Sequence, residues 1–118
     1  MKNLVNRVQL VGNLGIDPEI RNLESGKKVA QFSLATSVST GKGKEKQINT
    51  QWHQIVAWGG LATIAENYLE KGKKVAIEGS INYRSYEKKD GQKVFFTEIV
   101  ASDILMLSPK KQPVDQAA

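Results

Sequence analysis

The segment TQWHQIVAWGG, residues 50–60, decides how the rest of the chain is interpreted. It is rich in valine, isoleucine, tryptophan and threonine, apolar and polar residues alternate along it, and two glycines end it. Such a pattern predicts a β-strand, in which successive side chains point to opposite faces. The two faces would carry Trp52, Gln54, Val56 and Trp58 on one side, and His53, Ile55 and Ala57 on the other.

These two faces suit different environments. Ile55 and Ala57 suit a hydrophobic core, whereas Gln54 is a poor neighbour for tryptophans that pack in one. Large aromatic residues usually bury, so core packing of Trp52 and Trp58 stays an alternative. We expect both indoles to face outward, where each can stack on an unpaired base for roughly 1–3 kcal/mol.

The composition excludes several classes of site. A chain of 118 residues is expected to form one domain, and without cysteine it has neither a disulfide nor a thiolate metal site. Its one histidine, His53, rules out multi-histidine metal sites and has no recognisable acid–base partners, so a structural role is expected. Asp17 and Glu19 are weak evidence for a metal. We therefore expect no enzyme, no metal site and no cofactor.

The charge balance favours a polyanionic partner. Lysine and arginine number 17 against 12 aspartates and glutamates, a net charge of +5, which suits nucleic acid or an anionic membrane surface. The first residues, MKNLVNRVQLVGN, contain no long apolar run, so neither a signal peptide nor a membrane span is expected. The predicted location is the cytoplasm.

The periodicity along the chain predicts three strands, one helix and two further strands. The helix is LATIAENYLEK, with Gly72 as its C-cap, and Asp90-Gly91 predicts a hairpin turn. Residues 15–28 are expected to form a turn and loop, and residues 40–50 a flexible, positively charged hairpin loop. The predicted strands are residues 4–14, 29–37, 50–60, 74–86 and 94–107, and the helix is residues 61–71.

This order matches the OB-fold, a five-stranded Greek-key barrel whose helix lies between strands three and four. A small open sheet with one packed helix is the alternative. Residues 1–107 would form the OB-fold domain and residues 108–118 a short flexible tail. OB-folds bind oligonucleotides or oligosaccharides on one face.

Two charged hairpins supply further candidates. Tyr83 and Tyr86 flank Arg84, and strand alternation puts Tyr86 on the same face as Arg84, which favours Tyr86 as a stacking residue. Arg84 would contact phosphate or stack through its guanidinium group. A single loop lysine is usually only solvated, but together with the aromatics three loop lysines resemble a cationic rim: Lys42, Lys44 and Lys46.

Taken together, these segments resemble the bacterial single-stranded DNA-binding protein family. The VGNLGxDPE pattern and the Trp52-His53 pair are the most specific parts. The resemblance runs through almost all of residues 4–107, over RVQLVGNLGIDPEIR, FSLATS, TQWHQIVAWG, YLEKGKKVAIEGSI and DGQKVFFTEIVA.

The resemblance implies an OB-fold that binds single-stranded DNA without sequence preference, without catalysis and without a cofactor. It also implies a homotetramer, with a dimer left open, and roles in replication, recombination and repair at the nucleoid. Family stacking residues correspond to Trp52, Trp58 and Tyr86, and family cationic contacts to Arg7, Arg21, Lys71 and Arg84. His53 corresponds to a histidine associated with subunit contacts.

The chain departs from the family pattern in two places. Relatives often carry another tryptophan where this chain has Thr40, which implies one stacking platform fewer. Relatives also continue into a disordered tail with an acidic tip that recruits partners, whereas this sequence ends at SPKKQPVDQAA, so we expect no recruitment through such a tip.

Two other binding functions stay open on the sequence. The aromatic face could be a protein–protein surface, which would bind with little salt dependence. It could also bind single-stranded RNA, because stacking and charge do not distinguish the 2′-hydroxyl.

Overall fold

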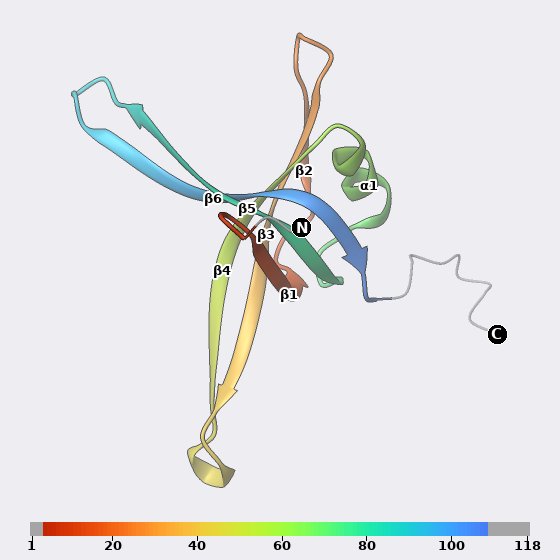
Figure 1. Cartoon of the computed structure of the whole chain (residues 1–118), viewed down its shortest axis with the longest axis vertical. Helices are drawn as coiled ribbons and strands as arrows, with labels where there is room; N and C mark the ends of the chain where they lie inside the picture. Colours follow the sequence, from red (N-terminus) through yellow and green to blue (C-terminus); the bar gives the residue numbers. More distant parts are fainter. Residues whose placement is uncertain (1–3, 109–118) are drawn as a thin grey trace, which may run out of the picture.

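The computed structural model describes residues 4–108, and strands dominate this part of the chain (Figure 1). Long segments with alternating apolar residues form the strands, as the period of two requires. The elements in chain order are β1 (Val8–Leu14), β2 (Glu19–Asn22), β3 (Lys28–Thr40), the 3-10 helix η1 (Gly43–Glu45), β4 (Gln47–Trp58), α1 (Gly60–Tyr68), β5 (Lys74–Glu87) and β6 (Lys93–Met106).

Five of these strands close into a barrel. Hydrogen-bonded neighbours follow the order β1-β5-β6-β4-β3, and β1 also pairs with β3, which joins the two ends. β4 and β6 run parallel, and the other barrel pairs are antiparallel. With α1 between the third and fourth barrel strands in the chain, this is the predicted OB-fold. The prediction of fold class is confirmed.

Alternate residues of the barrel strands fill the interior. Phe32, Leu34, Ile55, Val75 and Ile77 are the largest side chains that are fully buried. The helix adds small residues to the same core, Ala62 and Ala65, and packs beside β3 and β4. Side chains with almost no exposed surface make the largest hydrophobic contribution to stability.

Two glycines allow strands to approach closely where the barrel curves. A Cβ on Gly12 would lie 2.2 Å from the carbonyl oxygen of Ala35, where β1 meets β3. A Cβ on Gly79 would lie 2.2 Å from the carbonyl oxygen of Val100, beside the irregularity in the β5–β6 register. Only glycine fits such approaches without moving the backbone.

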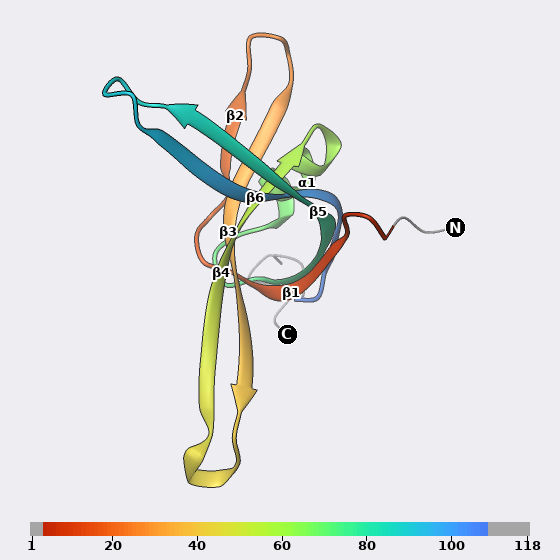
Figure 2. The same cartoon turned by 60° about the vertical axis from the view of Figure 1, so that its left-hand side comes forward.

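Three hairpins extend well beyond the barrel: β2–β3, β3–β4 and β5–β6. Figures 1 and 2 show them pointing in different directions, with the β3–β4 hairpin opposite the other two. The β5–β6 hairpin turns at Lys88–Gln92, where Gly91 has a φ of 87° and its N–H donates to the Lys88 carbonyl at 2.9 Å. The predicted turn at Asp90-Gly91 is confirmed.

Several predicted boundaries are wrong. Residues 19–22 form a strand, β2, rather than part of a loop, because they pair with β3 and place Ile20 against the core. Residues 47–50 belong to β4, so the charged loop is shorter than expected. β1 begins at Val8 rather than Leu4, because Asn6 pairs through its side chain with the backbone of Ile81 in two hydrogen bonds of 2.8 Å.

The helix also ends earlier than predicted. α1 stops at Tyr68, and Leu69 takes an extended conformation that buries its side chain in the core. Gly72 is not the helix C-cap. It has a φ of 92° in the turn that follows, where its N–H donates to the Leu14 carbonyl at 2.9 Å.

Within residues 4–108, no helix is long and apolar enough to cross a membrane. The predicted tail, residues 108–118, lies outside the described residues except for Ser108.

Candidate nucleic-acid interface

β4 holds the two tryptophans on its outer face. The indole-bearing residues Trp52 and Trp58 are 61% and 44% exposed, whereas Ile55 and Ala57 are fully buried on the inner face. The alternation that places them follows from the pairing of β4 with β3 along its whole length. The prediction that both tryptophans face out of the core is confirmed.

Val56 lies between the two tryptophans, yet it is only 5% exposed. The reason is the β5–β6 hairpin, whose base stands beside the outer face of β3 and β4 and leaves a hollow of about 440 Å³. We call this hollow the β4 groove. Its lining residues are Gln31, Gln54, Val56, Arg84, Phe96, Thr97 and Glu98.

Aromatic and guanidinium groups form the hairpin side of the β4 groove. The rings of Tyr86 and Phe96 stack with centroids 5.3 Å apart and 23° between their planes. The guanidinium carbon of Arg84 lies over the same Phe96 ring, 5.7 Å from its centroid. Tyr86 is 50% and Phe96 40% exposed, so flat surface remains available for a ligand.

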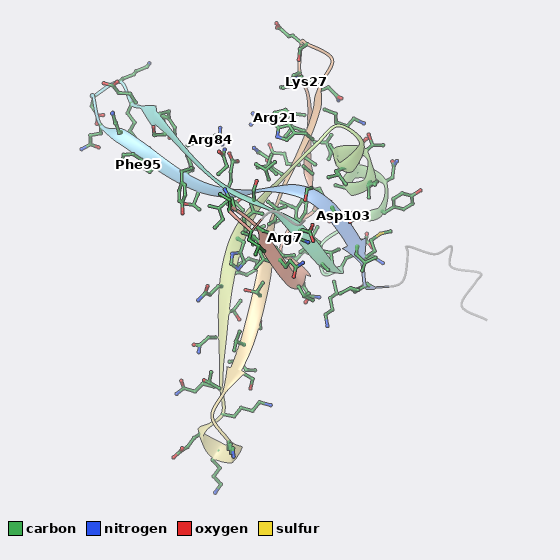
Figure 3. All side chains as sticks on the ribbon, viewed as in Figure 1. Arg7, Arg21, Lys27, Arg84, Phe95 and Asp103 are labelled. Atoms are coloured by element: carbon green, nitrogen blue, oxygen red, sulfur yellow. The ribbon has the colours of Figure 1, made fainter. Side chains whose placement is uncertain are left out.

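Phe96 is missing from the sequence-based site, although the sequence holds a signal for it. Counting strand pairs back from the Asp90-Gly91 turn places Phe96 opposite Arg84, on the face that carries Tyr86. Its neighbour Phe95 and the residue Tyr83 lie on the other face of the hairpin, each 75% exposed. Figure 3 shows Arg84 and Phe95 projecting from opposite sides of this hairpin.

Trp58 also borders a second hollow, of about 660 Å³, between the β2–β3 hairpin and the start of α1. Two cationic residues that the sequence analysis did not single out, Lys27 and Lys28, line it. Lys28 is ion-paired with Glu66 at 2.6 Å. No local sequence pattern predicts this hollow, because its lining residues come from three separate elements.

Trp52 rests on a glycine. A Cβ built on Gly15 would lie 2.2 Å from the Cζ3 atom of the Trp52 indole, so the ring occupies the space that a larger residue would fill. Gly15 is itself fixed by its N–H, which donates to the Ser33 carbonyl at 3.0 Å. The turn after β1 therefore helps to position the first tryptophan.

The cationic candidates are dispersed. Lys42, Lys44 and Lys46 are exposed around η1, at the far end of the β3–β4 hairpin. Arg21 is exposed on β2, 4.0 Å from Glu19. Of the seven cationic residues proposed from the sequence, only Arg84 lines the β4 groove.

Arg7 and Lys71 occupy other parts of the barrel. Arg7 donates to Glu78 at 2.6 Å, and Gln9 donates to the same carboxylate oxygen at 3.1 Å. The backbone N–H of Lys71 donates to Asp17 at 2.8 Å, which leaves its exposed ammonium group free of that contact. Neither residue lines the β4 groove, although Lys71 is bonded to the turn after β1 whose Gly15 contacts the Trp52 indole.

His53 lies on the inner side of β4 and is half-buried. Its Nε2 atom and the Thr36 hydroxyl are 2.9 Å apart and share a hydrogen bond across the β3–β4 ladder. This arrangement suits the structural role predicted for it.

The arrangement offers flat surfaces and positive charge in separate places. Indole, phenol and phenyl rings can stack on unpaired bases of any sequence, and exposed lysines can neutralise phosphates. Within residues 4–108, no cluster of three or more histidine, aspartate or glutamate side chains is arranged to hold a metal ion.

Comparisons with known proteins agree with this chemistry. The model of the single-strand binding protein family matches residues 5–107. Single-stranded DNA-binding protein 1 of Chlorobaculum tepidum is 48% identical over 111 residues, which cover 90% of this chain and 67% of that protein. A protein of the same name from Xylella fastidiosa is 40% identical over 110 residues, covering 91% of this chain and 80% of that protein.

A solved structure, described as the Plasmodium falciparum SSB complex with ssDNA, has a similar fold. Its TM-score is 0.80 at 32% sequence identity, and the match covers 92% of this chain and 99% of that one.

Proposed function

The chain belongs to the single-strand binding protein family, and from this we propose that it binds single-stranded DNA along the outer face of β4. The observation that carries the proposal is the pair of exposed tryptophans, Trp52 and Trp58, which flank along β4 the groove-lining residues Gln54 and Val56. Relatives at 40–48% identity bear the name single-stranded DNA-binding protein, which supports it.

Binding would rest on stacking. Bases of a single strand would stack on Trp52, Trp58 and Tyr86, each contact contributing roughly 1–3 kcal/mol whatever the base. Paired bases present no free face, so a duplex would bind far more weakly. No chemical step is needed, and the family is one of binding proteins rather than enzymes.

Phosphate contacts would come from exposed cations outside the β4 groove. Lys42, Lys44 and Lys46, exposed around η1, would contact a strand that runs along the β3–β4 hairpin, and the exposed Arg21 and Lys71 would contact it elsewhere. Arg7 and Arg84 differ from the three loop lysines, because each is ion-paired with a glutamate, as Arg21 is at the longer distance of 4.0 Å. Each phosphate neutralised would add about −0.7 to the slope of log K against log salt.

We also propose that the protein assembles into a homotetramer, or a dimer, and protects single strands at the nucleoid during replication, recombination and repair. The outer face of β1, β5 and β6 supports assembly, because Val11 and Leu105 are 53% and 61% exposed there, on either side of Ala76. Apolar residues gathered on one face commonly mark an interface. His53 would contribute to subunit contacts.

A tryptophan fluorescence titration tests the function. Oligo-dT, oligo-rU and a DNA duplex of equal length are each added at low and high salt, to the wild type and to Trp52→Phe and Trp58→Phe. We expect strong quenching by oligo-dT, little by duplex, weaker binding in salt, and a smaller quench in each single-tryptophan variant.

Each other outcome has a definite meaning. Binding without quenching would remove the tryptophans from the site. No binding at low salt would overturn the proposal, and binding to a protein partner that is insensitive to salt would favour an interaction module instead. Equal affinity for oligo-rU and oligo-dT would extend the function to RNA.

A further inference from the structure

Glu98 is the only charged residue that is buried among residues 4–108, at 7% exposure. It lies on β6 and lines the β4 groove. One of its oxygens, Oε1, forms an ion pair with Nε of Arg84 at 2.5 Å and accepts a hydrogen bond from Nδ2 of Asn82 at 3.2 Å. A buried carboxylate without such partners would be strongly destabilising, so this pair is fixed in the fold.

Arg84 is therefore held at two points. Glu98 binds one edge of its guanidinium group, and the group lies over the ring of Phe96. Its side chain is nevertheless 55% exposed, so the planar group is presented at the groove rather than hidden in it. Guanidinium planes stack on bases as well as on aromatic rings.

The charge of Arg84 is already balanced. A cation paired with a carboxylate carries little net charge, so its contact with DNA would release few counterions. The exposed lysines around η1 contrast with it, because none of Lys42, Lys44 and Lys46 forms an ion pair with a residue between 4 and 108. Among these candidates, the unpaired lysines lie on the β3–β4 hairpin and the stacked planar groups on the β5–β6 hairpin.

We propose that Arg84 acts on single-stranded DNA as a planar stacking surface rather than as a phosphate contact, and that Glu98 is the positioning residue that fixes this role. Arg84, Phe96 and Tyr86 form one stacking wall, and Arg84 and Phe96 share the β4 groove with Gln54 and Val56, which lie between the two tryptophans along β4. The inference rests on the function proposed above, since it assumes that the β4 groove receives the strand.

The salt dependence of binding separates the two roles of an arginine. The affinity for oligo-dT is measured by tryptophan fluorescence at four or more salt concentrations, for the wild type, Arg84→Ala, Arg84→Lys and Glu98→Gln. The triple variant Lys42→Ala/Lys44→Ala/Lys46→Ala is the control for removing unpaired cations. Circular dichroism and thermal unfolding establish that each variant is folded.

We expect Arg84→Ala to weaken binding about tenfold at every salt concentration, with the slope of log K against log salt unchanged. Arg84→Lys should weaken binding equally, because lysine keeps the charge but has no planar group. The triple lysine variant should have a shallower slope, by about 0.7 for each phosphate that is no longer neutralised.

Glu98→Gln gives the sharpest expectation. Glutamine keeps an oxygen that can accept from Asn82 but removes the charge that compensates Arg84, so the guanidinium group becomes available to a phosphate. The slope should then steepen by about 0.7, a change that a purely structural role of Glu98 would not produce.

The possible failures are distinct. If the wild type does not bind oligo-dT, the proposed function fails. If it binds, but Arg84→Ala makes the slope shallower by about 0.7 and Arg84→Lys restores it, Arg84 is a phosphate contact and this inference is wrong. If Arg84→Ala does not fold, Arg84→Lys alone decides between the roles. A wild-type slope in Glu98→Gln would exclude Glu98 as the positioning residue.

Discussion

The two faces of β4 lie in different environments, one in the core and one at the surface. Its inner face buries Ile55 and Ala57 completely, while its outer face exposes Trp52 and Trp58. Neighbouring residues in the sequence thus belong to the core and to the candidate site in turn. Alternate positions of β4 therefore serve stability and binding, so single substitutions can change one property without the other.

The largest effect is expected on the inner face. Ile55→Ala removes a fully buried side chain at the centre of the barrel and should lower the free energy of unfolding by about 2–5 kcal/mol. Urea unfolding followed by circular dichroism measures this change. The folded fraction should still bind oligo-dT as the wild type does. Impaired binding with unchanged stability would mean that the two faces have been assigned the wrong way round.

The outer face should show the reverse. Trp52→Ala and Trp58→Ala should each weaken oligo-dT binding by about 1–3 kcal/mol, because each removes a stacking surface. The free energy of unfolding should change far less than for Ile55→Ala, by about 0.5 kcal/mol for Trp52 and somewhat more for the 44%-exposed Trp58. Fluorescence anisotropy of labelled oligo-dT measures the affinity without relying on tryptophan.

Tyr83→Ala is the matched control for these variants, since Tyr83 is an exposed aromatic on the face of the β5–β6 hairpin away from Arg84. It should leave the affinity unchanged. A decrease as large as that of Trp52→Ala would show that any exposed ring contributes, whichever face it lies on.

A smaller effect is expected from a substitution at Gly15, which contacts the Trp52 indole. Gly15→Ala places a methyl group where the Trp52 indole now lies, and the indole must move because the backbone cannot. Stability should fall by less than about 1 kcal/mol, because the displaced group is the end of an exposed side chain. Oligo-dT affinity should fall by part of the Trp52→Ala decrease, with a changed near-ultraviolet circular dichroism spectrum.

Gly60→Ala is the control for the glycine change, because a Cβ there would meet nothing within 4 Å. It should alter neither the spectrum nor the affinity. If Gly15→Ala behaves in the same way, the contact between Gly15 and the indole does not position Trp52.

The fold could be predicted because its main signals are local. The alternation in residues 50–60, the helical period that follows and the order of elements favoured the OB-fold over a small open sheet with one helix. β2 was missed because its four residues are too few for alternation to show, and only pairing with β3 makes them a strand. The helix end was misplaced because burial of Leu69 outweighed the preference for glycine at a helix terminus.

The site was predicted only in part for a related reason. Strand alternation puts Trp52 and Trp58 on one face, and the apolar residues Ile55 and Ala57 on the other face indicate that the tryptophans point outward. Burial of Val56 does not, because it depends on how the β5–β6 hairpin curves over β4. The ion pair of Arg84 with Glu98 joins β5 to β6, and which residues of these strands face each other depends on their register. The order of charged residues in the sequence therefore does not show that the charge of Arg84 is balanced by Glu98.

The closure of the barrel has a consequence for synthesis of the chain. Residues 8–12 of β1 pair only with residues 75–79 of β5, although β1 is the first strand to be made. A protein leaves the ribosome with its N-terminus first, so β1 stays unpaired while more than half of the chain is still emerging. The hairpins in between can form as soon as their own residues are free. The first strand synthesised is therefore among the last to be paired.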